Sequence, residues 1–492
     1  MNRNKIVQAL IGAGLIACIT PAFAADTSAQ RIQLLENQIK VMQQQLDELK
    51  ASMAKSQDAA KAAPAAAATT TDTKDLAKQV EDLRNQVESQ AKETVVAGDI
   101  PNSFRIPGSD TSMHLYGIAE LNLTHDFKGY NGDIDYASFV PYVPLRGSAE
   151  AERTGSTALH TRTSRIGMEA ATPTSFGLVS AKIEGDFNND PKSPATGVAE
   201  NVGTQQATNS YNFRLRQAYV QAGSWLVGQT WTTFIDLDAA PETVDFNGPV
   251  GTTSMRQPQI RYTYKTPTAG NYTLALENPD SYVLKPSNSD SVYNTDSAIS
   301  RLPDVVARWD KASDWGTLSF RGVTQQFVLK DSSINASARG WGLAASSSIK
   351  MFSNDLLSLN ITGGEGVGRY FNYIEGAGYD ATNNKIVMEK VVGTVLGYQH
   401  KFNDKFRLDT AFGYQRSLTN DFTAWAHTVG LAADGYRYDM NRSVWQYHLG
   451  GFWNPTKEIE VGLEAIYGQR KTLANEKGDA SRINFLTRYY FN

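Results

Sequence analysis

Residues 459–467 read Ile-Glu-Val-Gly-Leu-Glu-Ala-Ile-Tyr, and apolar or aromatic side chains occupy every odd position. Glu460, Gly462 and Glu464 alternate with them. Successive side chains of a β-strand point to opposite faces of the sheet, so this stretch predicts a strand with one apolar and one charged face. A strand that faces lipid on one side and a water-filled lumen on the other has this pattern.

The same alternation recurs along the chain from Met113 to the C-terminus. It is clearest in residues 115–123, 179–186 and 484–491. Such runs extend over about 9–12 residues, which is the length that a tilted strand needs to cross a bilayer. The pattern therefore predicts an all-β transmembrane β-barrel of about sixteen antiparallel strands over residues 99–492.

The connections between these runs fall into two length classes. Short polar turns are expected at residues 172–174, 266–268, 311–314, 403–405 and 454–456. Long loops are expected at residues 126–161, 189–210, 234–255, 279–300 and 417–441. Strict alternation of short and long connections is typical of outer-membrane barrels, which have periplasmic turns at one end and surface loops at the other.

The composition agrees with a barrel and excludes other classes. The mean hydropathy of −0.38 would suggest a soluble protein, but lipid-facing and lumen-facing residues cancel in such an average. No apolar run of ~20 residues occurs, so a helical membrane protein is excluded. The net charge is −4 and no basic block is present, so nucleic acid is not an expected partner.

Residues 1–24 have the features of a secretory signal peptide. Arg3 and Lys5 precede an apolar stretch, and Ala22-Phe23-Ala24 forms a small-x-small cleavage site. The stretch that ends at Cys18 also resembles a lipobox, which would make this cysteine an acylated N-terminus. We expect cleavage after Ala24, which leaves a mature chain without cysteine, as suits an exported protein.

The segment after the signal peptide shows a helical period. Apolar residues recur at alternating spacings of three and four from Ile32 to Met53, which predicts an α-helical coiled coil over residues 25–58, located in the periplasm. Residues 59–98 form an Ala/Thr-rich linker and a second short helix. Isoleucine and leucine in the heptads would suit a dimer, but methionines blur that preference, so the heptads leave the oligomeric state open.

The charged residues expected to line the lumen follow from turning each apolar face outward. In residues 213–219, for example, Phe213, Leu215 and Tyr219 are expected to face lipid. The bases then expected inside, on the fourth to the ninth strands, are Arg214, Arg216, Arg261, Lys265, Arg308 and Arg321. The acids Glu460 and Glu464 are expected on the fifteenth strand, nearly opposite.

The loop at residues 234–255 occupies the position that commonly folds into the lumen of trimeric porins. It carries the acids Asp236, Asp238, Glu242 and Asp245. Arginines in a narrow aqueous channel attract carboxylates through their field and through bidentate hydrogen bonds, and acids facing them would orient a polar solute. The simpler alternative is that each arginine is only a solvated lumen side chain.

Enzymatic chemistry is not expected. The six histidines show no metal-ligand spacing, and no Ser/His pair is evident on adjacent lipid-facing positions. The sequence therefore predicts no catalytic residue, no metal site and no cofactor.

Two segments resemble the DcaP-like family of outer-membrane porins. One is Ser-Phe-Arg-Ile-Pro-Gly-Ser-Asp-Thr-Ser at residues 103–112, and the other is Arg-Leu-Arg-Gln-Ala-Tyr at 214–219 with Gly-Gln-Thr-Trp at 228–231. The resemblance extends over essentially the whole chain. It implies a homotrimeric channel with an N-terminal periplasmic coiled coil, associated with uptake of dicarboxylates and other small anions.

The pattern and the resemblance together predict an outer-membrane porin, surrounded by lipid, that passes small hydrophilic solutes and prefers small anions. A general, size-limited porin remains an alternative. A structural tether whose helix contacts peptidoglycan, or a surface adhesin, would also combine a coiled coil with a barrel. In such adhesins the barrel is short, whereas here it takes up most of the chain.

Overall fold

The computed structural model describes residues 96–129, 137–189, 211–284, 297–352, 354–374, 376–429 and 440–492. All of them belong to one compact unit, Gln90–Asn492. The predicted signal peptide and coiled coil, and the linker up to residue 95, lie outside the described residues.

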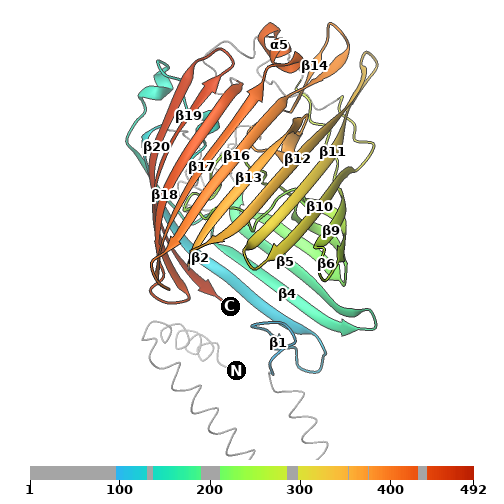
Figure 1. The fold of residues 1–492 in the computed structure, drawn as a ribbon, viewed down its shortest axis with the longest axis vertical. Coiled ribbons are helices and arrows are strands. Elements are labelled where there is room, and N and C mark those ends of the chain that lie inside the picture. The colour runs from blue at the N-terminus through green and yellow to red at the C-terminus, as the bar shows by residue number, and fades with distance from the viewer. Residues whose placement is uncertain are drawn as a thin grey trace, which may run out of the picture. The chain divides into compact units, whose positions relative to one another are not determined.

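Sixteen antiparallel strands form a closed barrel (Figure 1). They are β2 (Ser112–Lys128), β4 (Arg165–Thr174), β5 (Gly177–Asn189), β6 (Asn212–Ala222), β7 (Trp225–Trp231), β8 (Arg256–Lys265), β9 (Asn271–Glu277), β10 (Asp304–Ser313), β11 (Gly316–Lys330), β12 (Asn335–Met351), β13 (Asp355–Glu365), β16 (Lys390–Lys401), β17 (Phe406–Leu418), β18 (Asn441–Trp453), β19 (Ile459–Thr472) and β20 (Lys477–Phe491). Each of these strands pairs with the next one along the chain. The barrel closes because the first strand, β2, pairs with the last, β20, in an antiparallel register that begins at Gly117↔Phe491. Two short strands, β1 (Phe104–Arg105) and β3 (Ser156–His160), pair with β2. The predicted barrel of about sixteen strands is confirmed.

The alternation of the sequence corresponds to the two faces of the wall. On β11, for example, the Phe320 side chain is exposed on the outer face, and its neighbour Arg321 is buried on the lumen side. Along β13, Leu359 and Ile361 are exposed, whereas Asn360 between them is buried. An apolar outer face and a polar inner face are what a barrel needs between lipid and water.

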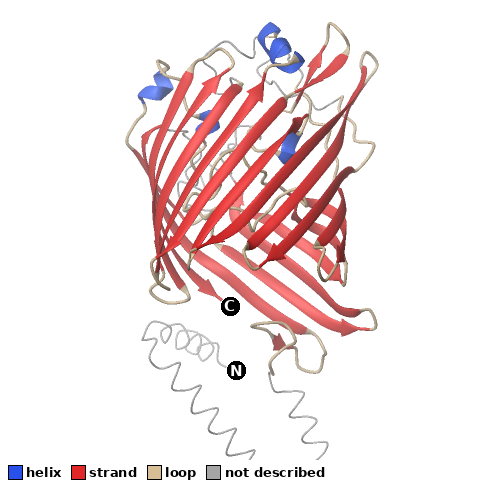
Figure 2. Cartoon of the chain, viewed as in Figure 1, coloured by secondary structure: helices blue, strands red, loops and turns tan. Residues whose placement is uncertain are grey.

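Helices and a small hairpin lie at the loop end of the barrel (Figure 2). They are α5 (Asp421–Thr428), the 3₁₀ turns η1 (Val140–Tyr142), η2 (Ala149–Glu152) and η4 (Gly368–Tyr370), and the hairpin of β14 (Ala377–Asp380) and β15 (Lys385–Met388). Phe422 and Trp425 of α5 pack against Leu284, Val387 and Leu473, which joins several loops into one apolar cluster. Among the described residues, no helix is both long enough and apolar enough to span a membrane.

Tight turns and long loops lie at opposite ends of the barrel, with two exceptions. At the loop end, only residues 331–334 join β11 to β12 and only residues 473–476 join β19 to β20. The Asp331 carboxylate accepts the backbone N–H groups of Ser333 and Ile334, each at 2.7 Å, and so closes the first of these turns. Asn475 takes a left-handed backbone conformation in the second, which asparagine tolerates. The predicted strict alternation was wrong at these two connections.

A bulge in β6 reverses the faces of part of that strand. Leu215 pairs with Gly185 and Gln217 pairs with Glu184, so Arg216 is an extra residue between them. One inserted residue moves every later side chain to the other face. Val220 is therefore exposed on the outer face, and the prediction that Tyr219 faces lipid was wrong.

Candidate functional site

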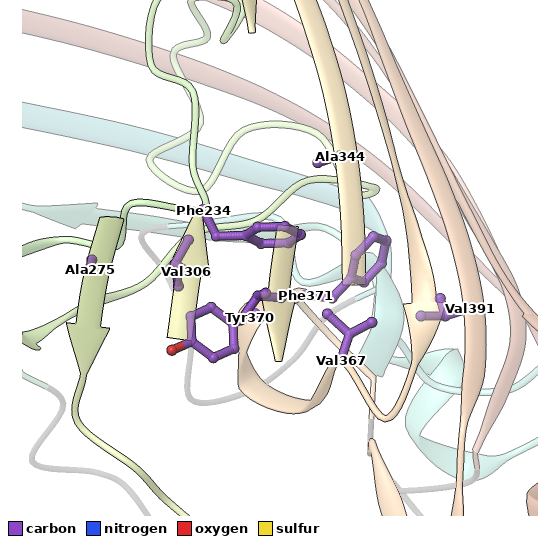
Figure 3. Packing of buried hydrophobic residues seen from close by; sticks show 9 residues of the cluster. Phe234, Ala275, Val306, Ala344, Val367, Tyr370, Phe371 and Val391 are labelled. Carbon is purple, nitrogen blue, oxygen red and sulfur yellow. The ribbon is translucent and has the colours of Figure 1, made fainter. Parts of the chain in front are cut away.

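The connection between β7 and β8, residues 232–255, crosses the lumen; we call it the inward loop. Phe234, near its start, is completely buried in a cluster with Val306, Tyr370 and Phe371 (Figure 3). The rings of Phe234 and Tyr370 meet edge to face, with centroids 6.0 Å apart. Farther along, Val250 packs against Val444 of β18. The loop therefore spans from the β10 side of the barrel to the opposite wall.

Two arginines predicted to line the lumen hold the start of this loop. Arg321 donates to the Phe234 carbonyl at 3.2 Å and to the Ser346 hydroxyl at 2.9 Å. Ser346 in turn donates to the Asp236 carboxylate, which also lies 3.3 Å from the Arg308 guanidinium. Because Arg321 is buried in these bonds, it supports the loop and has little contact with water.

A single carboxylate anchors the tip of the inward loop. Glu464 of β19 accepts the backbone N–H groups of Val244 at 3.1 Å and of Asp245 at 2.9 Å. His448 Nδ1 lies 3.3 Å from the same carboxylate. The Asp245 carboxylate accepts the Ser138 N–H at 2.7 Å, and burial raises the pKa of Asp245. Glu464, expected as an acid that faces the solute, is instead a buried anchor.

On three neighbouring strands of the wall, three arginines and two acids form what we call the arginine face. Arg165 lies on β4, Glu184 and Asp186 lie on β5, and Arg214 and Arg216 lie on β6. Arg216 forms ion pairs with both acids, with Glu184 at 2.8 Å and with Asp186 at 2.6 Å. Arg214 contacts Asp186 at 2.8 Å, and Arg165 lies 3.7 Å from Glu184.

The arginines of this face are more exposed than their acids. The side chain of Arg214 is 31% exposed and that of its partner Asp186 is 0% exposed. The corresponding values are 25% for Arg165 and 4% for Glu184. These two pairs therefore present their positive ends to the lumen, whereas Arg216 is buried with its acids. The ring of Phe246, on the inward loop, lies 5.6 Å from the Arg214 guanidinium carbon and 5.9 Å from that of Arg216, which places the loop against this face.

The remaining predicted bases lie nearer the turn end of the barrel. Arg261 lines a cavity of about 330 Å³ together with Arg308, Asp236 and Asp238. Arg261 forms no ion pair with any described residue. Lys265 is exposed at the end of β8.

A second cavity, of about 310 Å³, lies against the opposite wall; we call it the turn-side pocket. Its lining residues are Glu242, Thr243, Gln399, Lys401, Arg407, Phe452, Glu460, Arg488 and Tyr490. Glu460 contacts Arg407 at 2.9 Å and Arg488 at 3.3 Å. Glu242 contacts Arg407 at 2.6 Å. This wall therefore carries paired charges, whereas the sequence predicted acids alone.

Sequence reasoning missed Arg165, Glu184, Asp186, Arg407 and Arg488. The alternation of residues 179–186 already places Glu184 and Asp186 on the polar face of the strand. Ile166 is an apolar outward residue, and the same rule turns its neighbour Arg165 inward. Counting acids as well as bases on each inner face would have found Glu184 and Asp186, and extending the count of inward bases to every strand would have found the arginines. In the part of the chain that the structure describes, no three potential metal ligands gather.

A closed sixteen-stranded barrel with a polar, charge-lined lumen and a loop folded across it defines a channel of the porin class. The chain belongs to the DcaP outer membrane protein family, whose family model matches residues 77–491. It is thus an outer-membrane channel protein.

The chain is similar to several solved structures. The outer-membrane channel DcaP of Acinetobacter baumannii is 23% identical and aligns with a TM-score of 0.65, covering 80% of this chain and 100% of its own. OmpT of Vibrio cholerae is 13% identical, with a TM-score of 0.47 and coverage of 81% and 100%. An anion-selective porin from Comamonas acidovorans is 12% identical, with a TM-score of 0.45 and coverage of 77% and 100%. No curated protein sequence matches the chain significantly.

Proposed function

We propose that this channel allows passive diffusion of small hydrophilic solutes and prefers small anions such as dicarboxylates. The observation that carries the proposal is the unequal exposure on the arginine face, where Arg165 and Arg214 are solvated and their acids are buried. A solute that passes the arginine face in the lumen is within a Debye length, ~8 Å at physiological salt, of these guanidinium groups. The positive ends are nearest to it, so carboxylates are favoured.

A general, size-limited porin is the second candidate. It is favoured by the ion pairs around Arg214, Arg216, Arg308 and Arg407, because paired charges largely cancel at a distance. Ion selectivity, measured as the zero-current potential across a planar bilayer in a salt gradient, distinguishes the two candidates.

Neutralising the exposed arginines is expected to abolish the anion preference. In the double variant Arg165→Gln with Arg214→Gln, Glu184 and Asp186 keep Arg216 as partner, and the shift in gel mobility on heating checks that the barrel is folded. A unit charge about 4 Å away is worth ~1 kcal/mol in water, with opposite sign for an anion and a cation, so the anion/cation permeability ratio should fall roughly 25-fold for each charge removed. Arg301→Gln, at an exposed position of the long loop after β9, serves as the control and should change little. A wild-type channel that prefers cations, or a double variant with unchanged selectivity, would leave size-limited diffusion as the function.

The N-terminal segment completes the proposal. Residues 1–24 are a signal peptide that is removed, residues 25–58 form a periplasmic coiled coil, and residues 59–98 link it to the barrel. The channel assembles as a homotrimer whose main contact is between barrels, and the coiled coil adds order to it. A structural tether to peptidoglycan through this helix is the competing role for the segment.

Deletion of residues 26–95 is expected to leave a folded, conducting barrel. Every strand of the closed sheet lies beyond this segment, so the wall loses no hydrogen-bonded neighbour. Folding is checked by the shift in gel mobility on heating, and conductance is measured in planar bilayers. A truncated protein that fails to fold or to conduct would contradict this division of the chain.

A further inference from the structure

The turn-side pocket brings together side chains from the inward loop and from five strands. Gln399 and Lys401 come from β16, Arg407 comes from β17, and Glu242 comes from the loop. The Arg407 guanidinium lies 4.1 Å from the centroid of the Phe452 ring, which fixes its orientation in the wall. The pocket thus presents a held guanidinium to a small water-filled space.

Arg407 has three carboxylate partners, and they differ in how firmly they are held. Asp409 and Glu460 lie on β17 and β19 at 3.0 Å and 2.9 Å, and their side chains are only 4% and 7% exposed. Glu242 lies on the inward loop at 2.6 Å, and its side chain is 59% exposed. Because Glu242 is already largely hydrated, it can leave Arg407 at a small desolvation cost. Asp409 and Glu460 are buried in the wall and cannot leave Arg407 in this way.

A second cation in this pocket has no competing acid. Lys401 is exposed, lines the same cavity as Arg407, and forms no ion pair with any described residue. A solute with two carboxylates could therefore contact Arg407 with one of them and Lys401 with the other.

We propose that Glu242 is an internal carboxylate ligand that a passing solute displaces from Arg407, and that the turn-side pocket then holds a small dicarboxylate between Arg407 and Lys401. The exchange replaces one carboxylate by another, so the charge beside Arg407 is unchanged. Glu242 returns when the solute leaves, so it weakens binding and speeds release. This proposal rests on the proposed anion function and assigns it a second binding position, apart from the arginine face.

The test uses succinate block of single-channel current in the full-length protein, with butyrate as a probe that has a single carboxylate. Glu242→Gln removes the competing charge but keeps the shape of the side chain. The half-blocking succinate concentration is expected to fall about tenfold, equivalent to about 1.4 kcal/mol. Adding Lys401→Gln should then remove the advantage of succinate over butyrate, because the second carboxylate loses its partner.

Asp404→Asn is the matched control. It also removes one acidic charge at the turn end, but Asp404 is exposed in the turn before β17 and does not line the pocket. Its half-blocking concentration should equal that of the wild type. Equal block in Glu242→Gln and wild type, or the same tenfold change in Asp404→Asn, would overturn the proposal.

The zero-current potential, recorded on the same channels, separates this proposal from the proposed function. If the wild-type channel prefers anions but Glu242→Gln has the same half-blocking succinate concentration as the wild type, only the exchange at Arg407 is refuted. A cation-preferring wild type whose Glu242→Gln variant still binds succinate about tenfold more tightly would refute the general anion preference and support the pocket. Unchanged gel mobility of unheated Glu242→Gln shows that the variant is folded.

Discussion

Replacing Glu464 with alanine is expected to release the tip of the inward loop and to raise the single-channel conductance. Glu464 accepts two consecutive backbone N–H groups, those of Val244 and Asp245, and no other described side chain bonds to them. Hydrogen bonds to a charged group contribute about 1.5–3 kcal/mol each, so the tip loses roughly 3–6 kcal/mol of attachment. Because the loop crosses the lumen, its release widens the path for ions.

Conductance in concentrated KCl is the direct measurement, and current noise should rise as the loop moves. Glu458→Ala is a suitable control, because Glu458 is exposed in the turn before β19 and its side chain has no hydrogen bond among the described residues. The barrel itself should remain folded, since Glu464 contributes nothing to strand pairing beyond its backbone. A Glu464→Ala channel with wild-type conductance would mean that the other contacts of the tip suffice to hold it, namely the Ser138–Asp245 bond and the packing of Val244 against Phe452 and Leu486.

The outer face of the barrel was predictable from sequence because lipid imposes one rule on every strand. Any residue that faces the bilayer must be apolar, so the period of two identifies the strands and assigns most faces, as at Phe320 and Arg321. The assignment of faces from the period of two fails where a β-bulge inserts an extra residue into a strand. The extra residue at Arg216 leaves no mark on the alternation, which is why Tyr219 was assigned to the wrong face.

The path of the inward loop was beyond the reach of sequence. Its acids contact bases on strands far away in the chain, as Glu242 does with Arg407 and Asp236 with Arg308. These partners depend on how the barrel closes and on where the loop crosses it, and neither has a local signal. The same limit explains why Arg321 and Glu464 were expected to meet the solute, although both hold the loop.

Replacing Asp186 with alanine is expected to destabilise the barrel strongly. Asp186 is completely buried and contacts two guanidinium groups, those of Arg214 at 2.8 Å and Arg216 at 2.6 Å. Arg214 can turn toward the water of the lumen, but Arg216 is buried and keeps only Glu184. Removing one partner of a buried ion pair costs about 3–5 kcal/mol, because the remaining charge is left without compensation.

Urea unfolding followed by gel mobility measures this loss of stability, and two further variants test its cause. Asp421→Ala breaks the exposed pair of Lys385 and Asp421, which is worth ~1 kcal/mol or less, so it should leave the midpoint nearly unchanged. Adding Arg216→Met to Asp186→Ala removes the uncompensated charge and should restore much of the stability, because apolar replacements of buried pairs are often close to neutral. Without that recovery, the loss would come from the cavity left by the carboxylate, and the charge balance of the arginine face would not limit the stability of the wall.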